Sequence, residues 1–149
     1  GRPWLFDVAH NPDAMATLVA ALDALSLPRP RTAVVGILAD KDWRAMLGLL
    51  EGAVDRLVLV LPPDAPRERR WDPVAAARQV RAARVSVVSA LGEALAQAED
   101  GAVAGSMIVT GSFHTVGAAL GLLGLAPDGV DPPLGDPSGA PLQASAGGA

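Results

Sequence analysis

The sequence contains no cysteine among its 149 residues. This absence excludes disulfide bonds, thiolate metal sites and a cysteine nucleophile, and it agrees with a cytoplasmic protein. No apolar run approaches the roughly 18 residues that a membrane-spanning helix needs, and the first residues lack the basic and apolar regions of a signal peptide. We therefore expect a cytoplasmic protein that does not act at a membrane.

Aromatic residues and net positive charge are also scarce. The chain has three tryptophans, two phenylalanines and a formal net charge of -4. A dedicated nucleic-acid binder needs a basic surface, so nucleic acid is not expected as a partner. Six of the twelve basic residues nevertheless fall within residues 67–84, and these are Arg67, Arg69, Arg70, Arg78, Arg81 and Arg84. We interpret this segment as a solvated arginine-rich surface, with an interaction surface as the alternative.

Several motifs of complete enzymes are missing. The sequence has no G-x-x-x-x-G-K-[ST] phosphate loop and no G-x-G-x-x-G after its first predicted strand. It also has no G-x-S-x-G nucleophile elbow. Taken alone, the chain is therefore not expected to be a complete ATPase, dehydrogenase or hydrolase.

What the sequence does contain is a regular alternation of apolar strands and amphipathic helices. Half of the residues are hydrophobic, and the length suits one domain with a real core. The predicted strands are residues 4–8, 32–37, 56–61, 84–89 and 106–112, and the predicted helices are residues 11–25, 42–50, 72–81, 91–98 and 114–123. Apolar strands separated by helices indicate a mostly parallel sheet with helices on both faces. The expected fold is a three-layer, Rossmann-like open α/β sheet.

The composition changes near the end of the chain. Residues 126–149 are rich in Pro, Gly, Ala and Ser and contain little that a core could bury. We therefore predict one domain over residues 1–125 and a disordered tail over residues 126–149. The chain begins at Gly1 without an initiator methionine, and we interpret it as a fragment of a longer protein.

Three polar loops follow predicted strands, at residues 7–11, 40–42 and 111–115. In open α/β sheets, ligands bind beyond the carboxyl ends of the strands. The first and third loops lead directly into helix N-termini, whose free N–H groups suit anions. Together the loops predict a pocket for a small carboxylate or a phosphate.

Each polar residue of the first and third loops also has a simpler interpretation. Asn11 fits a helix N-cap, and Asp7 can accept backbone hydrogen bonds in the turn. His10 can be an ordinary half-buried histidine, and His114 a surface residue. The two histidines are far apart in sequence and have no supporting ligand spacing, so no metal site is predicted.

Lys41 is more informative because every other basic residue except the two histidines is an arginine. A compact ammonium group suits one carboxylate or phosphate oxygen. A cation near a helix N-terminus is mildly unfavourable, so helix electrostatics do not call for it. The alternative is an exposed lysine paired with Asp40 or Asp42.

Three segments taken together resemble a known family. "DVAHNPDA", "VVGILADKDW" and "VTGSFHTVGAAL" are similar, in this order, to the C-terminal domain of folylpolyglutamate synthases and dihydrofolate synthases of the Mur ligase superfamily. The resemblance covers residues 4–123 and leaves the tail unexplained. The motifs "AHNP" and "ADKD" favour the folate branch over the peptidoglycan branch.

The resemblance implies an ATP-dependent, amide-forming ligase that adds L-glutamate to folate or dihydropteroate. In this family ATP phosphorylates the folate-side carboxylate, and the amino group of glutamate then attacks the acyl phosphate. ATP and Mg²⁺ would be bound mainly by an N-terminal ATPase domain of the same enzyme, which this chain does not contain. The chain alone is therefore expected to be inactive.

The resemblance also implies roles for four residues. Asp7 would contact the nucleotide, at its ribose. His10, Lys41 and Ser112 would form the glutamate site, with Lys41 neutralising the side-chain carboxylate and Ser112 hydrogen-bonding a carboxylate. No covalent catalytic residue is implied, because these residues position the substrate and stabilise charge. His114 matches no role in the family.

Two other functions stay open at this point. One is the C-terminal domain of a peptidoglycan-type Mur ligase. The other is a stand-alone, non-catalytic α/β module that binds a small carboxylate or a nucleotide. The sequence does not distinguish dihydrofolate synthase from folylpolyglutamate synthase activity, and it says nothing of the glutamate linkage, the chain length made or the oligomeric state.

Overall fold

A computed structural model describes residues 2–100 and 104–126. These residues form a five-stranded sheet with strand order β1-β5-β2-β3-β4. The strands are β1 (Trp4–Asp7), β2 (Arg31–Val35), β3 (Arg56–Val60), β4 (Arg84–Val88) and β5 (Ser106–Thr110), and the helices are α1 (Pro12–Ala24), α2 (Trp43–Glu51), η1 (Arg67–Arg69), α3 (Pro73–Ala77), α4 (Leu91–Asp100) and α5 (Phe113–Leu122). The predicted tail lies outside the described residues from residue 127 onward, so its disorder stays a prediction.

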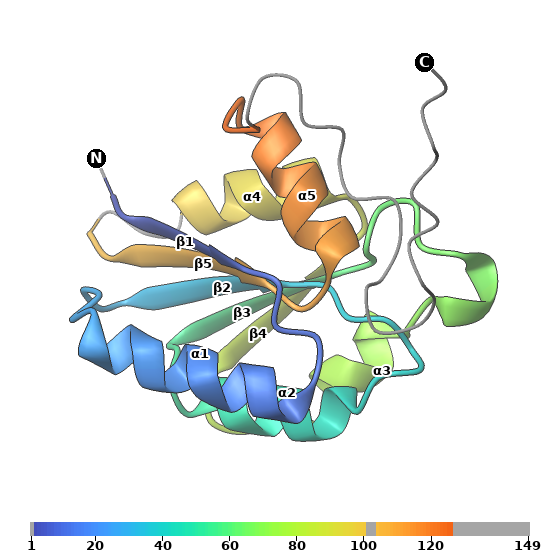
Figure 1. The fold of residues 1–149 in the computed structure, drawn as a ribbon, viewed down its shortest axis with the longest axis horizontal. Helices are drawn as coiled ribbons and strands as arrows, with labels where there is room; N and C mark the ends of the chain where they lie inside the picture. Colours follow the sequence, from blue (N-terminus) through green and yellow to red (C-terminus); the bar gives the residue numbers. More distant parts are fainter. Residues whose placement is uncertain (1, 101–103, 127–149) are drawn as a thin grey trace, which may run out of the picture.

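The described chain is built in three layers (Figure 1). Helices α1, α2 and α3 cover one face of the sheet, and α4 and α5 cover the other. All four strand pairings are parallel, as expected when helices connect successive strands. The predicted three-layer α/β fold is therefore confirmed, and within the described residues the sheet is entirely parallel.

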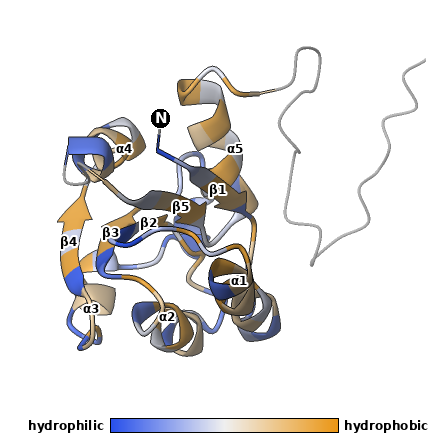
Figure 2. Cartoon of the chain, turned by 90° about the vertical axis from the view of Figure 1, so that its left-hand side faces the viewer, coloured by the Kyte–Doolittle hydropathy of each residue, from blue (hydrophilic) through white to orange (hydrophobic). Residues whose placement is uncertain are grey.

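Alternation along the strands divides the core between the two faces. In β3, Leu57 and Leu59 pack with α1 and α2, whereas Val58 and Val60 pack with α4 and α5. Apolar residues run along the strands between the two helical layers (Figure 2). This arrangement explains why the central strands read as continuous apolar runs rather than as alternating patterns.

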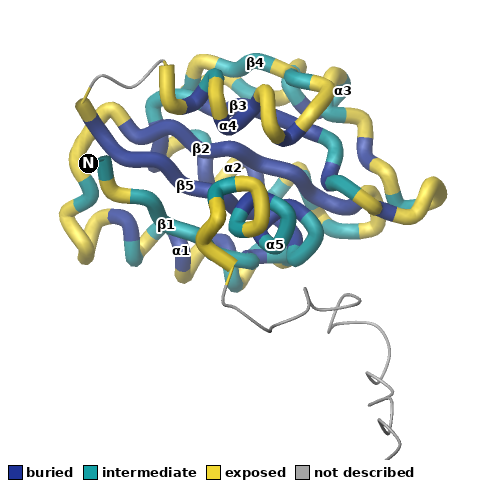
Figure 3. The backbone as a smooth tube through the Cα atoms, turned by 90° about the horizontal axis from the view of Figure 1, so that it is seen from above, coloured by how far each residue is buried: buried dark blue, intermediate teal, exposed yellow. Residues whose placement is uncertain are grey.

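Burial falls from the centre of the sheet to its edges (Figure 3). Every residue of β2 and β5 is buried, whereas β1 is half-buried throughout and β4 is partly exposed. The expectation of strands buried on both faces therefore holds for the centre of the sheet and fails at β1 and β4, which have only one neighbouring strand each.

The helices begin at the predicted caps. The side chains of Asn11, Asp42 and Asp72 each accept a backbone N–H in the first turn of α1, α2 and α3, which satisfies donors that have no partner inside the helix. The predicted helix at residues 72–81 is wrong in length, because α3 ends at Ala77. The Glu51 carboxylate accepts the N–H groups of residues 81 and 82 and so holds this stretch in a turn.

The arginine-rich segment does not form one surface. The backbone carbonyl of Arg69 accepts the N–H of Ala39, so η1 lies beside the loop that follows β2. Arg84 instead begins β4 and is paired with Arg56 at the start of β3. Five of the six arginines are exposed, as expected. The solvated character is as expected, but Arg70 lies beside the loop after β2 whereas Arg84 lies where β4 begins, so these two do not share one surface.

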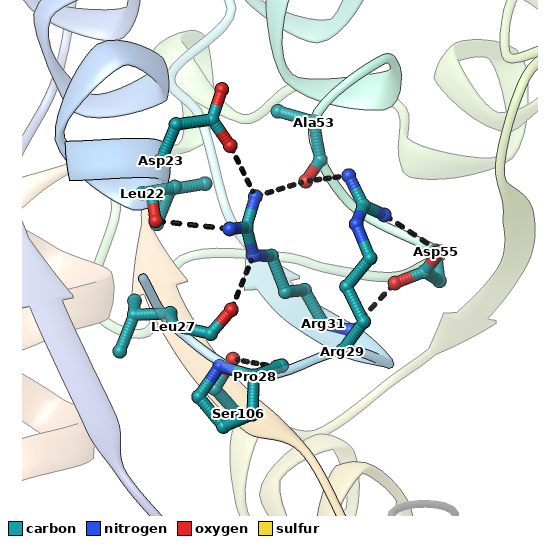
Figure 4. A network of polar contacts seen from close by, with 9 residues as sticks. All are labelled: Leu22, Asp23, Leu27, Pro28, Arg29, Arg31, Ala53, Asp55 and Ser106. Carbon is teal, nitrogen blue, oxygen red and sulfur yellow. Dashed lines mark hydrogen bonds and ion pairs between the residues drawn. The ribbon is translucent and has the colours of Figure 1, made fainter. Parts of the chain in front are cut away.

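A buried arginine connects several segments at the end of the sheet where the strands begin (Figure 4). Arg31 is 5% exposed, and its guanidinium donates to the carbonyls of Leu22, Leu27 and Ala53 at the ends of α1 and α2. Asp23 accepts a further bond at 2.9 Å. One cation thus binds three backbone carbonyls in or just after the last turns of α1 and α2, where carbonyls lack acceptor roles in a helical ladder.

Across the residues that the structure describes, no helix combines the length and the apolar character needed to cross a membrane.

Candidate functional site

The three predicted loops meet at one edge of the sheet. They follow β1, β2 and β5, and β5 lies between the other two strands. Parallel strands end at the same edge, so the loops are brought side by side although they are distant in sequence. An antiparallel bridge between Leu38 and Arg70 ties the loop after β2 to the segment that follows η1.

A small pocket opens between these loops. It brings together three of the four predicted site residues, His10, Lys41 and Ser112, while Asp7 does not line it. The other lining residues are Leu38, Gly111, Phe113 and His114. His114 was expected at the surface. The available signal was its place two residues after Ser112, in the turn that begins α5.

His10 lies at one wall of the pocket, directly after the buried Ala9. Its ring is 5.7 Å from the ring of Phe113, at a tilt of 41°. The Nδ1 atom of His10 is buried and has no hydrogen-bond partner within the described part of the chain. Buried polar atoms are normally paired, so this nitrogen is available to a group that binds here.

Asp7 ends β1 on the opposite side of the same loop. Its Oδ1 atom accepts the N–H of Ala9 at 2.9 Å, which fixes the turn. The carboxylate is half-buried, and its second oxygen can accept a further hydrogen bond. Asp7 is in register with Thr110 of β5, whose buried hydroxyl has no partner among the residues described.

Lys41 lies half-buried between two acids, Asp40 and Asp42. Arg69 binds both carboxylate oxygens of Asp40, at 2.9 and 3.0 Å. These hydrogen bonds hold the pKa of the Asp40 carboxyl below its usual range. Asp42 accepts the N–H of Ala45 and caps α2. The two acids therefore shape the loop that carries the Lys41 ammonium group to the pocket.

Ser112 is the N-cap of α5 and part of a chain of hydroxyl groups. Its Oγ accepts the N–H of Thr115 at 3.1 Å and lies 2.8 Å from Thr115 Oγ1. Thr115 Oγ1 donates to the carbonyl of Gly36 at 3.0 Å. Because the Thr115 proton is used in that bond, Ser112 must donate its own proton to Thr115. Ser112 could donate to a substrate carboxylate only if this bond broke.

Two glycines allow this close contact between β2, β5 and α5. A Cβ atom at Gly36 would collide with Thr115 Oγ1. Gly111 has φ +112° and lies against the backbone of Gly36, a conformation that side chains rarely permit. The glycines thus place the start of α5 against the end of β2.

We expect Thr115→Val to lower the free energy of unfolding of this chain by about 1–3 kcal/mol, because the buried Ser112 hydroxyl and Gly36 carbonyl would lose their partner. Urea unfolding followed by circular dichroism measures the change. Thr115→Ser is the matched control, since it keeps the hydroxyl. A loss as large in Thr115→Ser as in Thr115→Val would contradict the role of the hydroxyl.

The described residues do not build a metal site. They include no group of three His, Asp or Glu side chains that could hold a metal ion, which agrees with the donor set of the pocket. Its nitrogen-bearing side chains, next to the N-terminus of α5, suit an anion better than a cation.

Comparison with known proteins gives consistent matches. The family model described as "Mur ligase, glutamate ligase domain" matches residues 1–113. The chain is 44% identical over 63 residues to folylpolyglutamate synthase of Lacticaseibacillus casei, which covers 42% of this chain and 14% of that protein. It is 35% identical over 114 residues to the dihydrofolate synthase/folylpolyglutamate synthase of Escherichia coli K12, and this match covers 75% of this chain and 26% of that protein.

A solved structure supports the same comparison. The bifunctional folylpolyglutamate synthase/dihydrofolate synthase of Yersinia pestis, complexed with AMPPNP and a Mn ion, has a TM-score of 0.68 and 34% sequence identity to this chain. The match covers 82% of this chain and 28% of that one. The chain thus spans less than a third of the length of each of these relatives.

Proposed function

The chain belongs to the Mur ligase family, in its glutamate ligase domain, and from this premise we propose that it is the C-terminal domain of an ATP-dependent ligase that adds L-glutamate to folate or dihydropteroate. The remaining part of the enzyme would be an N-terminal ATPase domain. The complete ligase is the protein formed by that domain and this chain. The relatives named above, which are folate-glutamylating enzymes, support this choice over a peptidoglycan-type ligase.

The observation that carries the proposal is the pocket between the three loops. It joins His10, Lys41 and Ser112 from three separate segments, and these are the residues that the resemblance assigns to glutamate. The lining residues include no acid, so a dicarboxylate meets no like charge there. The pocket lies on an open edge of the sheet, where a second domain can close over it.

The chemistry of the reaction needs positioning more than a reactive side chain. An acyl phosphate formed from the folate-side carboxylate is already activated, and the attacking group is the amine of L-glutamate. Lys41 would neutralise the glutamate side-chain carboxylate, His10 would contact the same substrate, and the Ser112 turn would hold the N-terminus of α5 in place. Orientation of this kind supplies a large part of the barrier reduction in bimolecular reactions.

The nucleotide is proposed to meet this chain at Asp7. The free oxygen of its carboxylate can accept a hydroxyl group of the ribose. Mg²⁺ is proposed to be bound mainly by the N-terminal domain, as the resemblance to the folate-glutamylating ligases implies. The nucleotide and Mn ion in the Yersinia pestis structure support the use of both by the complete ligase.

The proposal is tested by incubating the complete ligase and this chain separately with ATP, Mg²⁺, radiolabelled L-glutamate and either dihydropteroate or a reduced folate. We expect label in the folate product only with the complete ligase. A parallel incubation offers a muropeptide as the acceptor, and transfer of glutamate to it instead would support the peptidoglycan branch. Tight binding of glutamate or ATP by this chain alone would support a stand-alone binding module.

We expect Asp7→Asn in the complete ligase, which keeps an oxygen for the Ala9 N–H, to raise the KM for ATP by about tenfold or more. The reason is that a hydrogen bond to a charged group contributes roughly 1.5–3 kcal/mol. The KM for L-glutamate should stay within twofold. Initial rates at varied ATP and varied glutamate measure both constants. Asp13→Ala, an exposed acid on α1, is the control. A rise in the glutamate KM alone would contradict the assignment of Asp7 to the nucleotide.

A further inference from the structure

His114 lies in the pocket, but the resemblance gives it no role. It is the second residue of α5 and is half-buried. The pocket lining thus includes three nitrogen-bearing side chains, His10, Lys41 and His114, and no carboxylate. His10 comes from the loop after β1 and His114 from the first turn of α5, and the ring of Phe113, the residue before His114, lies 5.7 Å from the ring of His10.

The turn that begins α5 has few donors left for a substrate. The Ser112 proton is donated to Thr115, and the Thr115 proton is donated to Gly36. The N–H of Thr115 is also used, by Ser112 Oγ. The imidazole of His114 is therefore the side chain of this turn that can donate a hydrogen bond into the pocket. Backbone N–H groups of the first helical turn can donate as well.

We infer that His114 is a specificity-determining residue that binds one carboxylate of the amino-acid substrate, while Lys41 binds the other. Ser112 and Thr115 are then positioning residues that fix the turn carrying His114. This inference rests on the proposed function, which makes L-glutamate the substrate. The two residues come from separate elements, since Lys41 precedes α2 and His114 begins α5, and L-glutamate carries two carboxylates.

The first test compares His114→Ala and His114→Gln in the complete ligase. We expect His114→Ala to raise the KM for L-glutamate at least tenfold, with the KM values for ATP and for the folate acceptor within twofold of the original. His114→Gln should recover part of the loss, because its amide can still donate. Leu122→Ala, at the exposed far end of α5, is the control and should change none of these constants.

The second test is a double-mutant cycle with Lys41→Ala. If the two residues hold different carboxylates, their fold-changes in kcat/KM for L-glutamate should multiply in the double variant. A double variant no worse than the poorer single variant would mean a shared carboxylate and would overturn the inference.

Two other outcomes would also overturn it. One is an unchanged glutamate KM in His114→Ala. The other is an equal rise of all three KM values together with a lower unfolding midpoint, which indicates a structural role alone. Failure of the unaltered complete ligase to transfer glutamate would remove the proposed function itself, so the two failures are distinguishable.

Discussion

Replacing Lys41 with alanine in the complete ligase is expected to lower kcat/KM for L-glutamate by roughly 100-fold, which corresponds to about 3 kcal/mol, the usual cost of removing one partner of an enclosed charge pair. Lys41 is the single lysine of the chain, and it lines the pocket together with two histidines. Without the ammonium group, one substrate carboxylate would be desolvated as the pocket closed and would gain no opposite charge.

The loss should fall on glutamate and spare the other two substrates. Steady-state rates at varied L-glutamate, ATP and folate acceptor separate the three constants. Arg44→Ala is the matched control: it also removes one positive charge, three residues after Lys41, but Arg44 is exposed and lies over the ring of Trp43. Equal losses in the two variants would mean that general electrostatic attraction, and not a contact with glutamate, explains the effect.

Much of the fold could be predicted because it depends on local patterns. Strand β2 is buried along its length, and its residues 33–35 are apolar since both faces of the sheet are covered. Helix α1 begins directly after Asn11 because the Asn11 side chain accepts an N–H of the first turn. The site loops could be placed because parallel strands end at one edge. These features depend on residues that are close in sequence or on a general rule of sheet topology.

The features that were missed depend on contacts between distant segments. Helix α3 ends at Ala77, and the chain beyond it is tied to Glu51, some thirty residues earlier, which accepts the N–H groups of residues 81 and 82. The role of the Ser112 hydroxyl is set by Thr115 and by the carbonyl of Gly36 in another loop. His114 enters the pocket because β5 lies between β1 and β2. No periodicity or spacing in the sequence encodes that strand order.

The second large effect concerns the end of the sheet where the strands begin, opposite the end that carries the pocket. Arg31→Met should lower the free energy of unfolding of this chain by about 3 kcal/mol, because the half-buried Leu27 carbonyl would lose its donor. The carbonyls of Leu22 and Ala53 would keep only the longer hydrogen bonds that the Leu27 N–H and Arg29 donate to them. Three backbone carbonyls, those of Leu22, Leu27 and Ala53, would lose a donor (Figure 4). Methionine fills a similar volume, so a cavity contributes little to this expected loss.

Arg29→Met is the control: it also removes one arginine charge from this network, but from an exposed side chain rather than a buried one. Arg29 forms an ion pair with Asp55 at 2.8 Å, but these two side chains are 51% and 39% exposed. Exposed pairs contribute about 1 kcal/mol or less, so this variant should lose far less stability than Arg31→Met. Urea unfolding of the two variants measures both values, and similar losses would show that Arg31 acts only as a surface charge.

The same variants separate stability from function. Arg31 lies where β2 begins, and the pocket lies beyond the end of that strand. In the complete ligase, well below the unfolding transition, Arg31→Met should therefore leave the KM for L-glutamate unchanged while lowering the unfolding midpoint. Lys41→Ala should do the reverse. A change of the glutamate KM in Arg31→Met under those conditions would mean that the two edges of the sheet are coupled through the packing of α1 and α2.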